Sequence, residues 1–199
     1  MLVIGVTGNF GTGKTTVCTI LAELGAAVIS ADNLGHELLE CDSQIYREVV
    51  AAFGDGILAT DRQIDRKKLA EVVFKDSASE ARLNAITHPV LHRIIQQKVE
   101  IFRGKGISIV VLEAALLIEA NWKTLVDQVW VTVAPEAVIV DRLKSQRGYK
   151  KEQIEARLRT QMPQKEKVKY ADVIIDTDCS RDELKAQVVK LWQKLQSSL

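Results

Sequence analysis

The sequence predicts an α/β fold in which a five-stranded parallel sheet carries helices on both faces. Five short apolar, β-branched runs are spaced along the chain, and helical material follows each of them. With 199 residues, 47% of them hydrophobic and 27% charged, the chain can bury one packed core and is too apolar to be disordered. The expected strands are 2–7, 26–30, 107–112, 129–133 and 171–176.

The first expected strand leads directly into a glycine-rich loop. Residues 8–15 read GNFGTGKT, which satisfies the G-x-x-x-x-G-K-[ST] pattern of a phosphate-binding P-loop. The residues that follow carry an apolar stripe with helical spacing, and Gly25 marks its end. A glycine-rich turn with a chance lysine is the alternative, and the strand, loop and helix order argues against it. We therefore expect a P-loop NTPase type of sheet.

The residue types of this loop explain how it would hold a nucleoside triphosphate. Gly8, Gly11 and Gly13 lack Cβ atoms, so the backbone can turn its N–H groups toward a phosphate at a helix N-terminus. Lys14 would reach the β and γ phosphates, and the Thr15 hydroxyl would ligate Mg²⁺. The residues expected to contact the phosphates are Gly8, Asn9, Phe10, Gly11, Thr12, Gly13, Lys14, Thr15 and Thr16.

The second expected strand delivers Asp32 just beyond its C-terminal end. Ligands of open α/β sheets bind outside these strand ends, so Asp32 is a candidate general base. Asp is also a favoured N-cap, and Asp32 as the cap of a helix beginning near Leu34 is an equal alternative. Residues 32–35 match the D-x-x-G string of switch GTPases, but the sequence contains no Asn-Lys-x-Asp partner.

Residues 34–103 read as helices with few strand signals, which is more than a crossover between strands requires. We expect this block to be an insertion that covers the substrate side. Its expected helices are 34–40, 45–53, 66–74 and 79–102. Pro89 predicts an interruption of the last helix, and the resulting kink would aim His88 out of the helical face. A surface histidine at a helix start is the alternative.

The third expected strand is the clearest buried strand of the sequence, and Glu113 follows it. P-loop proteins carry a carboxylate at this position to hold Mg²⁺, and the length of Glu favours a contact through water.

A basic helical hairpin is expected after the fourth strand. Pro135 opens a helix that runs through Leu143, and residues 151–162 form a second helix with apolar positions four residues apart. Lys and Arg residues are frequent in this segment. They form either a solvent-exposed basic face or a group that binds phosphates. We expect residues 135–163 to form a lid. The chain then reads as the fifth strand and a closing amphipathic helix over 183–195.

Charge and cysteine usage exclude several classes of protein. The net charge of +1 gives no global basic field of the kind that nucleic-acid binding requires. Cys18, Cys41 and Cys179 include no C-x-x-C pair, which indicates neither a disulfide framework nor a zinc site and fits a reducing cytoplasm. No signal peptide and no apolar run of about 18 residues is found, so we expect neither export nor a membrane span. No pattern indicates an oligomeric state.

These residues resemble the dephospho-CoA kinase family, whose members phosphorylate the ribose 3′-hydroxyl of dephospho-CoA in the last step of coenzyme A synthesis. The similarity covers nearly the whole chain. The family's Asp-Ala-Asp motif appears as 30–32, its His-Pro pair as 88–89, and its Pro-Leu-Leu-Phe-Glu string as 115–119. The matches around the end of the lid are Arg157, Gln161, Met162, Pro163, Lys167, Ala171 and Asp172.

The resemblance implies an ATP-dependent kinase that uses Mg²⁺, with dephospho-CoA as its small-molecule substrate. It implies a nucleotide-binding core of 1–33, 104–134 and 164–199, a CoA-substrate domain of 34–103 and the lid. The catalytic residues it implies are Asp32, Lys14, Arg142 and Arg147; the substrate contacts are Asp32, His88, Glu113 and Leu116.

The chain departs from the family pattern at four positions. Ser30 replaces the first motif Asp, Glu113 replaces an Asp, and Thr177 stands where Asn is common in the nucleotide-base loop. Gln146 holds the place of the second lid arginine, and we expect the adjacent Arg147 to stand in for it. Two rival functions are another P-loop small-molecule or nucleoside kinase, and a nucleotide switch that transfers nothing.

Overall fold

A computed structural model describes residues 1–40, 43–73 and 75–197. They fall into two compact units, Met1–Ser30 with Gln96–Leu199, and Ala31–Ile95. Two residues named in the sequence analysis lie outside the described residues. They are Cys41, one of the three cysteines, and Phe74, the expected end of a helix. The expected core, insertion and lid boundaries remain predictions.

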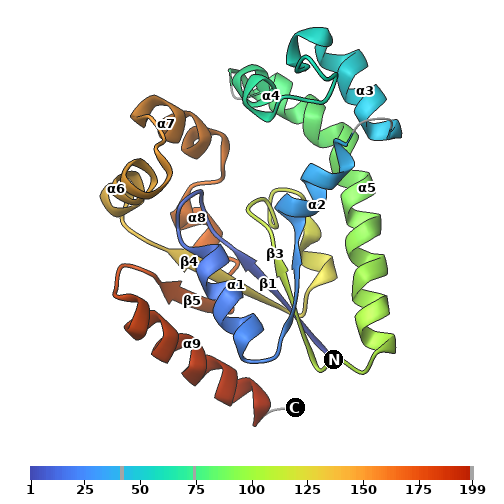
Figure 1. The fold of residues 1–199 in the computed structure, drawn as a ribbon. Helices are drawn as coiled ribbons and strands as arrows, with labels where there is room; N and C mark the ends of the chain where they lie inside the picture. The colour runs from blue at the N-terminus through green and yellow to red at the C-terminus, as the bar shows by residue number, and fades with distance from the viewer. Residues whose placement is uncertain (41–42, 74, 198–199) are drawn as a thin grey trace. The chain divides into compact units, whose positions relative to one another are not determined.

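The first unit is built on one parallel sheet, as the sequence predicts. Its strands lie in the order β2-β3-β1-β4-β5, so β1 is central (Figure 1). Every strand pair is parallel, and Leu2 to Val6 of β1 stand opposite Ile109 to Glu113 of β3. The strands are β1 (Leu2–Thr7), β2 (Ala27–Ser30), β3 (Ile109–Glu113), β4 (Gln128–Val133) and β5 (Val173–Asp176).

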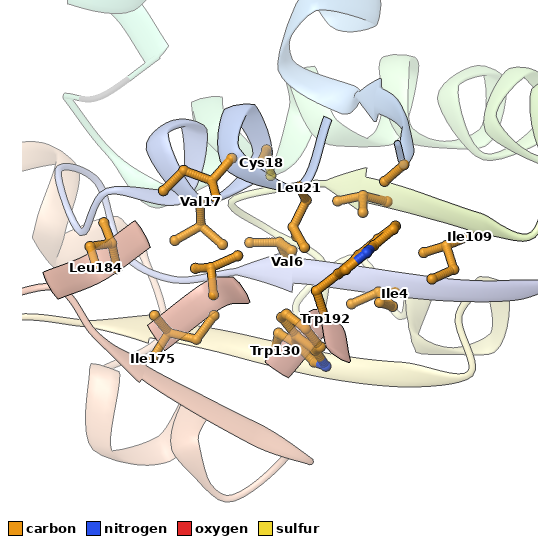
Figure 2. Close-up of a cluster of buried hydrophobic side chains, with 14 residues drawn as sticks. Ile4, Val6, Val17, Cys18, Leu21, Ile109, Trp130, Ile175, Leu184 and Trp192 are labelled. Carbon is orange, nitrogen blue, oxygen red and sulfur yellow. The ribbon is translucent and has the colours of Figure 1, made fainter. Parts of the chain in front are cut away.

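The main hydrophobic core lies between this sheet and two helices, α1 (Lys14–Glu23) and α9 (Arg181–Gln196). Alternate residues of the strands point into it, because side chains along a strand alternate between faces. Figure 2 shows the cluster with the helical side chains packed over the strands. Its buried members are Ile4, Val6, Val17, Cys18, Ile20, Leu21, Ala26, Ile109, Val111, Trp130, Ile175, Leu184, Val188 and Trp192.

The other face of β1 is covered by the segment that follows β3. A Cβ atom at Gly5 would lie 2.8 Å from a methyl carbon of Leu117 and 3.1 Å from one of Val126. Gly5 therefore lets this segment approach the strand closely. The segment includes the short helix η2 (Trp122–Leu125), and Trp122 and Leu117 are both buried.

The expected helical hairpin consists of α6 (Glu136–Arg147) and α7 (Lys151–Thr160). Pro135 precedes α6 as predicted, where its missing N–H costs no helical hydrogen bond. Helix α7 ends before Met162, so the expected apolar stripe stops at Leu158. A further short helix, α8 (Gln164–Val168), was not expected from the sequence.

The second unit is helical and has its own hydrophobic core. Its elements are α2 (Ala31–Leu38), α3 (Gln44–Phe53), η1 (Asp55–Ile57), α4 (Arg66–Val73) and the part of α5 (Ser77–Gly104) up to Ile95. The Ser43 hydroxyl caps α3 by accepting the N–H of Tyr46 at 2.9 Å. The buried residues of this core are Ile45, Tyr46, Val49, Ile57, Ile64, Leu69 and Val73.

The expected interruption at His88-Pro89 is wrong, because α5 continues through Pro89. Pro89 cannot donate to the carbonyl four residues earlier, but buried side chains on the C-terminal side, including Leu91 and Ile95, hold the helix in place. His88 is therefore neither released by a break nor placed at a helix start. None of the helices described is long and apolar enough to cross a membrane.

Candidate active site

The P-loop connects the end of β1 to the start of α1, and three glycines set its course. Gly8, Gly11 and Gly13 have φ angles of 151°, 83° and 82°, which residues with a Cβ atom rarely adopt. A Cβ at Gly8 would also lie 2.3 Å from the Thr132 hydroxyl and 2.6 Å from the Thr12 hydroxyl. The loop is therefore held tightly against β4.

Lys14 is the first residue of α1, and its side chain turns back into the loop. Its Nζ donates to the carbonyl oxygens of Gly8 at 3.0 Å and Asn9 at 3.1 Å, and the residue is buried. The ammonium group is thereby fixed at the loop. A fixed positive charge beside backbone N–H groups at a helix N-terminus is suited to bind the phosphates of a nucleotide.

Thr15 and Glu113 meet at the same end of the sheet. The Thr15 hydroxyl donates to Glu113 Oε1 at 2.6 Å, and Glu113 is the last residue of β3, with only 6% of its surface exposed. A hydroxyl beside a carboxylate supplies the hard oxygen ligands that Mg²⁺ prefers. The described residues include no group of three His, Cys, Asp or Glu side chains placed to hold a metal alone. This pair therefore fits an ion that takes its other ligands from phosphates and water.

Cys18, one turn further along α1, is buried beneath this pair. Burial raises the pKa of its thiol well above the usual value; the negative charge of Glu113 raises it further, and Lys14 opposes both. The thiol therefore stays protonated, and Cys18 has a packing role.

Arg142 of α6 reaches the P-loop through Thr177, which follows β5. Its guanidinium donates to the Thr177 hydroxyl at 3.2 Å and to the Thr177 carbonyl at 2.5 Å. The Thr177 hydroxyl donates in turn to Thr12 O at 3.1 Å. Thr177 thus provides the link between Arg142 and the loop at the position where the family commonly has Asn.

Arg147, the expected substitute for the second lid arginine, is placed differently. It is the last residue of α6 and is exposed, as is Gln146. The basic residues of this turn face the negative end of the helix dipole, which stabilises them there.

Phe10 attaches the P-loop to the hairpin of α6 and α7, a contact that the sequence analysis missed. The Arg157 guanidinium lies 4.7 Å from the centre of the Phe10 ring and 5.3 Å from that of Tyr149. The two rings themselves meet edge to face at 5.2 Å. Phe10 also packs against a small core inside the hairpin that is centred on the fully buried Ile154. Spacing along the chain gives no signal for a contact over such a distance in sequence.

An ion pair between the fully buried Lys167 and the partly exposed Glu119 joins α8 to the segment that follows β3. Lys167 of α8 has no exposed side-chain surface, and its Nζ lies 2.9 Å from Glu119 Oε1 and donates to Ala115 O at 2.6 Å. Burial lowers the pKa of Lys167, and the charge of Glu119 opposes this shift. Both residues belong to the family motifs recognised in the sequence, where no role followed from them.

The remaining expected residues divide between the two units. Leu116 lies in the segment after β3 and is half-buried. Asp32 is exposed in the first turn of α2, which begins at Ala31; its interpretation as an N-cap near Leu34 is therefore wrong. His88 is half-buried in α5, and burial lowers its pKa.

Comparisons with known proteins agree on one family. The family model described as Dephospho-CoA kinase matches residues 2–183. A relative of that name from Aquifex aeolicus is 42% identical over 192 residues, 96% of each chain, and one from Dehalococcoides mccartyi is 40% identical over 188 residues, 94% of each.

Solved structures agree with the sequence relatives. A dephospho-CoA kinase from Campylobacter jejuni aligns over 98% of each chain with a TM-score of 0.70 and 28% identity. A shikimate kinase from Acinetobacter baumannii, at 16% identity and a TM-score of 0.58 over 100% of this chain and 94% of its own, shares the fold. The chain belongs to the dephospho-CoA kinase family.

Proposed function

We propose that this protein transfers the γ-phosphoryl group of ATP to the ribose 3′-hydroxyl of dephospho-CoA, which gives coenzyme A and ADP. The observation that carries the proposal is the match to the family over residues 2–183. The P-loop, with Lys14 fixed inside it, supplies the phosphate site that such a transfer requires. The cysteine usage of the chain suits a reducing cytoplasm as its location.

In this proposal the P-loop N–H groups and Lys14 hold the β and γ phosphates, with contacts from Gly8 to Thr16. Thr15 would ligate Mg²⁺, and Glu113 would contact it through water. The ion, when bound, neutralises charge on the phosphate oxygens. Arg142 and Arg147 stabilise the charge that spreads over the transferring group.

The acceptor side of the proposal rests on residues whose roles are expectations from the family motifs. The 3′-oxygen attacks the γ-phosphorus, the bond to the β–γ bridging oxygen breaks, and the hydroxyl proton passes to Asp32. An exposed carboxylate such as Asp32 can accept this proton once the substrate covers it. His88 and Leu116 are the further substrate contacts that we propose.

The decisive experiment measures ATP consumption with and without dephospho-CoA and identifies the product by mass. The proposal expects consumption that depends on dephospho-CoA and a product phosphorylated at the 3′ position. A panel with shikimate, gluconate and nucleosides tests the rival kinases. Turnover with one of these and none with dephospho-CoA would overturn the proposal, and slow hydrolysis without acceptor dependence would support a switch.

Asp32→Asn tests the base, with ATP binding measured alongside. The variant should bind ATP normally and lose most of its transfer rate. A near wild-type rate of transfer would remove Asp32 from the chemistry.

The proposed metal ligand has a matched control one turn along α1. Thr15→Val should raise the Mg²⁺ concentration needed for half-maximal activity, because the variant lacks the hydroxyl ligand. Thr19→Val removes a hydroxyl that only bonds the Thr15 carbonyl at 2.8 Å, and it should leave the Mg²⁺ requirement unchanged. Equal requirements in both variants would exclude the Thr15 hydroxyl as a ligand.

A further inference from the structure

The first half of the P-loop is bonded to the residues that end the lid. The backbone N–H of Phe10 donates to Gln161 Oε1 at 2.8 Å, and Asn9 Nδ2 donates to Met162 O at 3.1 Å. Two adjacent loop residues are thus held by two adjacent lid residues. Phosphate-binding loops owe their affinity to the direction of their N–H groups, so contacts that fix the backbone at Asn9 and Phe10 affect the whole loop.

Gln161 and Met162 are themselves fixed from the core. The Met162 N–H donates to Glu119 Oε1 at 3.0 Å. Glu119 is paired with the fully buried Lys167, whose Nζ also bonds to Ala115 O. The ammonium group of Lys167 is buried and needs these partners, so the contacts tie Met162 to α8 and to the segment after β3.

Gln161 lies near the C-terminal end of the lid. It is the residue after the last turn of α7, and its backbone is extended, with φ −91° and ψ 152°. Arg157 of α7 lies over the ring of Phe10, and Gln161 accepts a hydrogen bond from the N–H of the same residue. Phe10 is therefore held by its ring from α7 and by its N–H from the residue that follows α7.

Asn9, the neighbour of Phe10 in the loop, is buried against the residues that follow α7. Only 5% of the surface of Asn9 is exposed, and its Oδ1 has no hydrogen-bond partner among the described residues. An unpaired buried acceptor destabilises a fold. The Nδ2 bond to Met162 keeps Asn9 in this position in spite of that cost.

We propose that Gln161 is a positioning residue for phosphoryl transfer. By accepting the N–H of Phe10 it fixes the P-loop backbone relative to the anchored end of the lid, so that the loop keeps its phosphate-binding shape when α6 and α7 move. This inference rests on the proposed function. The P-loop and the C-terminal end of the lid thus move together. The ion pair of Glu119 and Lys167 attaches this end of the lid to the first unit.

The test compares two replacements of Gln161 and one control. Gln161→Met has nearly the same length but no acceptor, and Gln161→Glu keeps an acceptor for the Phe10 N–H. Gln193→Met makes the same change at an exposed position of α9. Each variant is assayed for kcat and for the KM of ATP at saturating dephospho-CoA, for affinity toward a non-hydrolysable ATP analogue, for thermal stability and for hydrogen exchange over residues 8–13.

We expect kcat/KM for ATP to fall about tenfold in Gln161→Met, as the loss of one hydrogen bond to the loop backbone predicts. Exchange in the loop should accelerate while the melting temperature of the protein stays close to that of the wild type. Gln161→Glu should retain the kcat of the wild type and its slow hydrogen exchange in the loop. Its KM for ATP should rise, because the negative charge of Glu repels the phosphates. Gln193→Met should match the wild type in every measurement.

Two results would overturn the inference. One is unchanged kcat/KM and loop exchange in Gln161→Met. The other is equal loss of kcat and of melting temperature in both Gln161 variants, which would make Gln161 a structural residue only. If the wild type binds the ATP analogue but does not phosphorylate dephospho-CoA, the proposed function fails, while analogue affinity and loop exchange still decide the role of Gln161.

Discussion

At the scale of single residues, Gly8 carries the strictest requirement of the P-loop. Its φ of 151° and the approach of two threonine hydroxyls leave no space for a side chain. We expect Gly8→Ala to destabilise the fold by about 3 kcal/mol, the upper end of the usual cost of overpacking, and to abolish ATP binding.

Chemical denaturation and nucleotide titration measure these two effects. Gly104→Ala is the matched control, since Gly104 is exposed near the end of α5 with open space around it and no positive φ. That change should stabilise the protein by a few tenths to about 1 kcal/mol. A Gly8→Ala variant as stable as Gly104→Ala would contradict the tight contact with Thr132.

The residues of the P-loop could be predicted because their chemistry is local in the sequence. Gly8, Lys14 and Thr15 follow one another within a short motif, and the strand before it is plain from its apolar residues. The contacts of Phe10 with Arg157 and Gln161 could not, since a residue's partner across the fold leaves no mark on its neighbours in sequence. Asp32 illustrates a third case: its helix was expected, but the start of that helix lies three residues earlier than expected, which excludes the N-cap interpretation and leaves the general base a prediction.

At the scale of secondary structure, α5 makes stability depend on pH through His88. Burial lowers the pKa of His88 from its ordinary value of about 6.5. Between the lowered value and 6.5 the unfolded chain binds more protons than the folded chain, so the folded state loses stability as pH falls through this window. We expect the melting temperature to fall as the pH drops below about 6.5, and His88→Gln to reduce that fall.

His92→Gln, one turn along the same helix, is the control and should keep the full pH dependence. The carboxyl groups of Asp65, Asp76 and Glu183, whose pKa values are lowered by hydrogen bonds, lose their contributions only at more acidic pH. An identical pH profile in the wild type and His88→Gln would show that this histidine is not the source.

The lid hairpin provides the second prediction at this scale. If the exposed Arg147 reaches the transferring phosphoryl group when the lid closes, Arg147→Ala should lower kcat by about 10³-fold or more, as arginines of this kind do. The melting temperature should stay unchanged, because Arg147 lies at the exposed end of α6. Steady-state kinetics with dephospho-CoA tests this prediction. An unchanged kcat would mean that Arg147 only contributes to a solvent-exposed basic surface.

The strands were predicted better than the ends of the helices. A strand buried on both faces is a continuous apolar run, and β1 and β3 begin and end within two residues of expectation. Helix α5 was expected to break because Pro89 removes a hydrogen bond, but burial of the residues beyond it outweighs that loss. Helix α8 is only one turn long, too short for a periodic pattern to appear.

At the scale of the whole molecule, the two compact units have separate hydrophobic cores. Val49 of α3 and Val188 of α9 are both fully buried, one in each core. Replacement of either by Ala should cost about 2 kcal/mol through lost burial and a small cavity. We expect Val49→Ala to speed hydrogen exchange mainly in 31–95 and Val188→Ala mainly in the sheet and α1.

Exchange monitored by mass spectrometry on the full chain separates these patterns, because local opening reports the stability of the unit in which an amide lies. Equal acceleration across all the described residues in both variants would mean that the units unfold as one. The sequence predicted the α/β class from alternating strands and helices, and it predicted a helical block in the middle. Periodicity carries no information about which core a part of a long helix joins, so the boundary of the two units within α5, between Ile95 and Gln96, could not be predicted from the sequence.

The pairing of β1 with β3 affects the order in which a newly made chain can fold. Leu2 pairs with Ile109, and Ile4 pairs with Gln128. The strand that leads into the P-loop therefore has no strand to pair with until the ribosome has synthesised about 100 further residues. Residues 31–95, which pack mainly among themselves, can form their core while β1 is still unpaired. Non-local parallel pairing is slow and leaves apolar strands open to aggregation. During synthesis, the apolar strand that leads into the P-loop therefore stays without its sheet partners until β3 and β4 have been made.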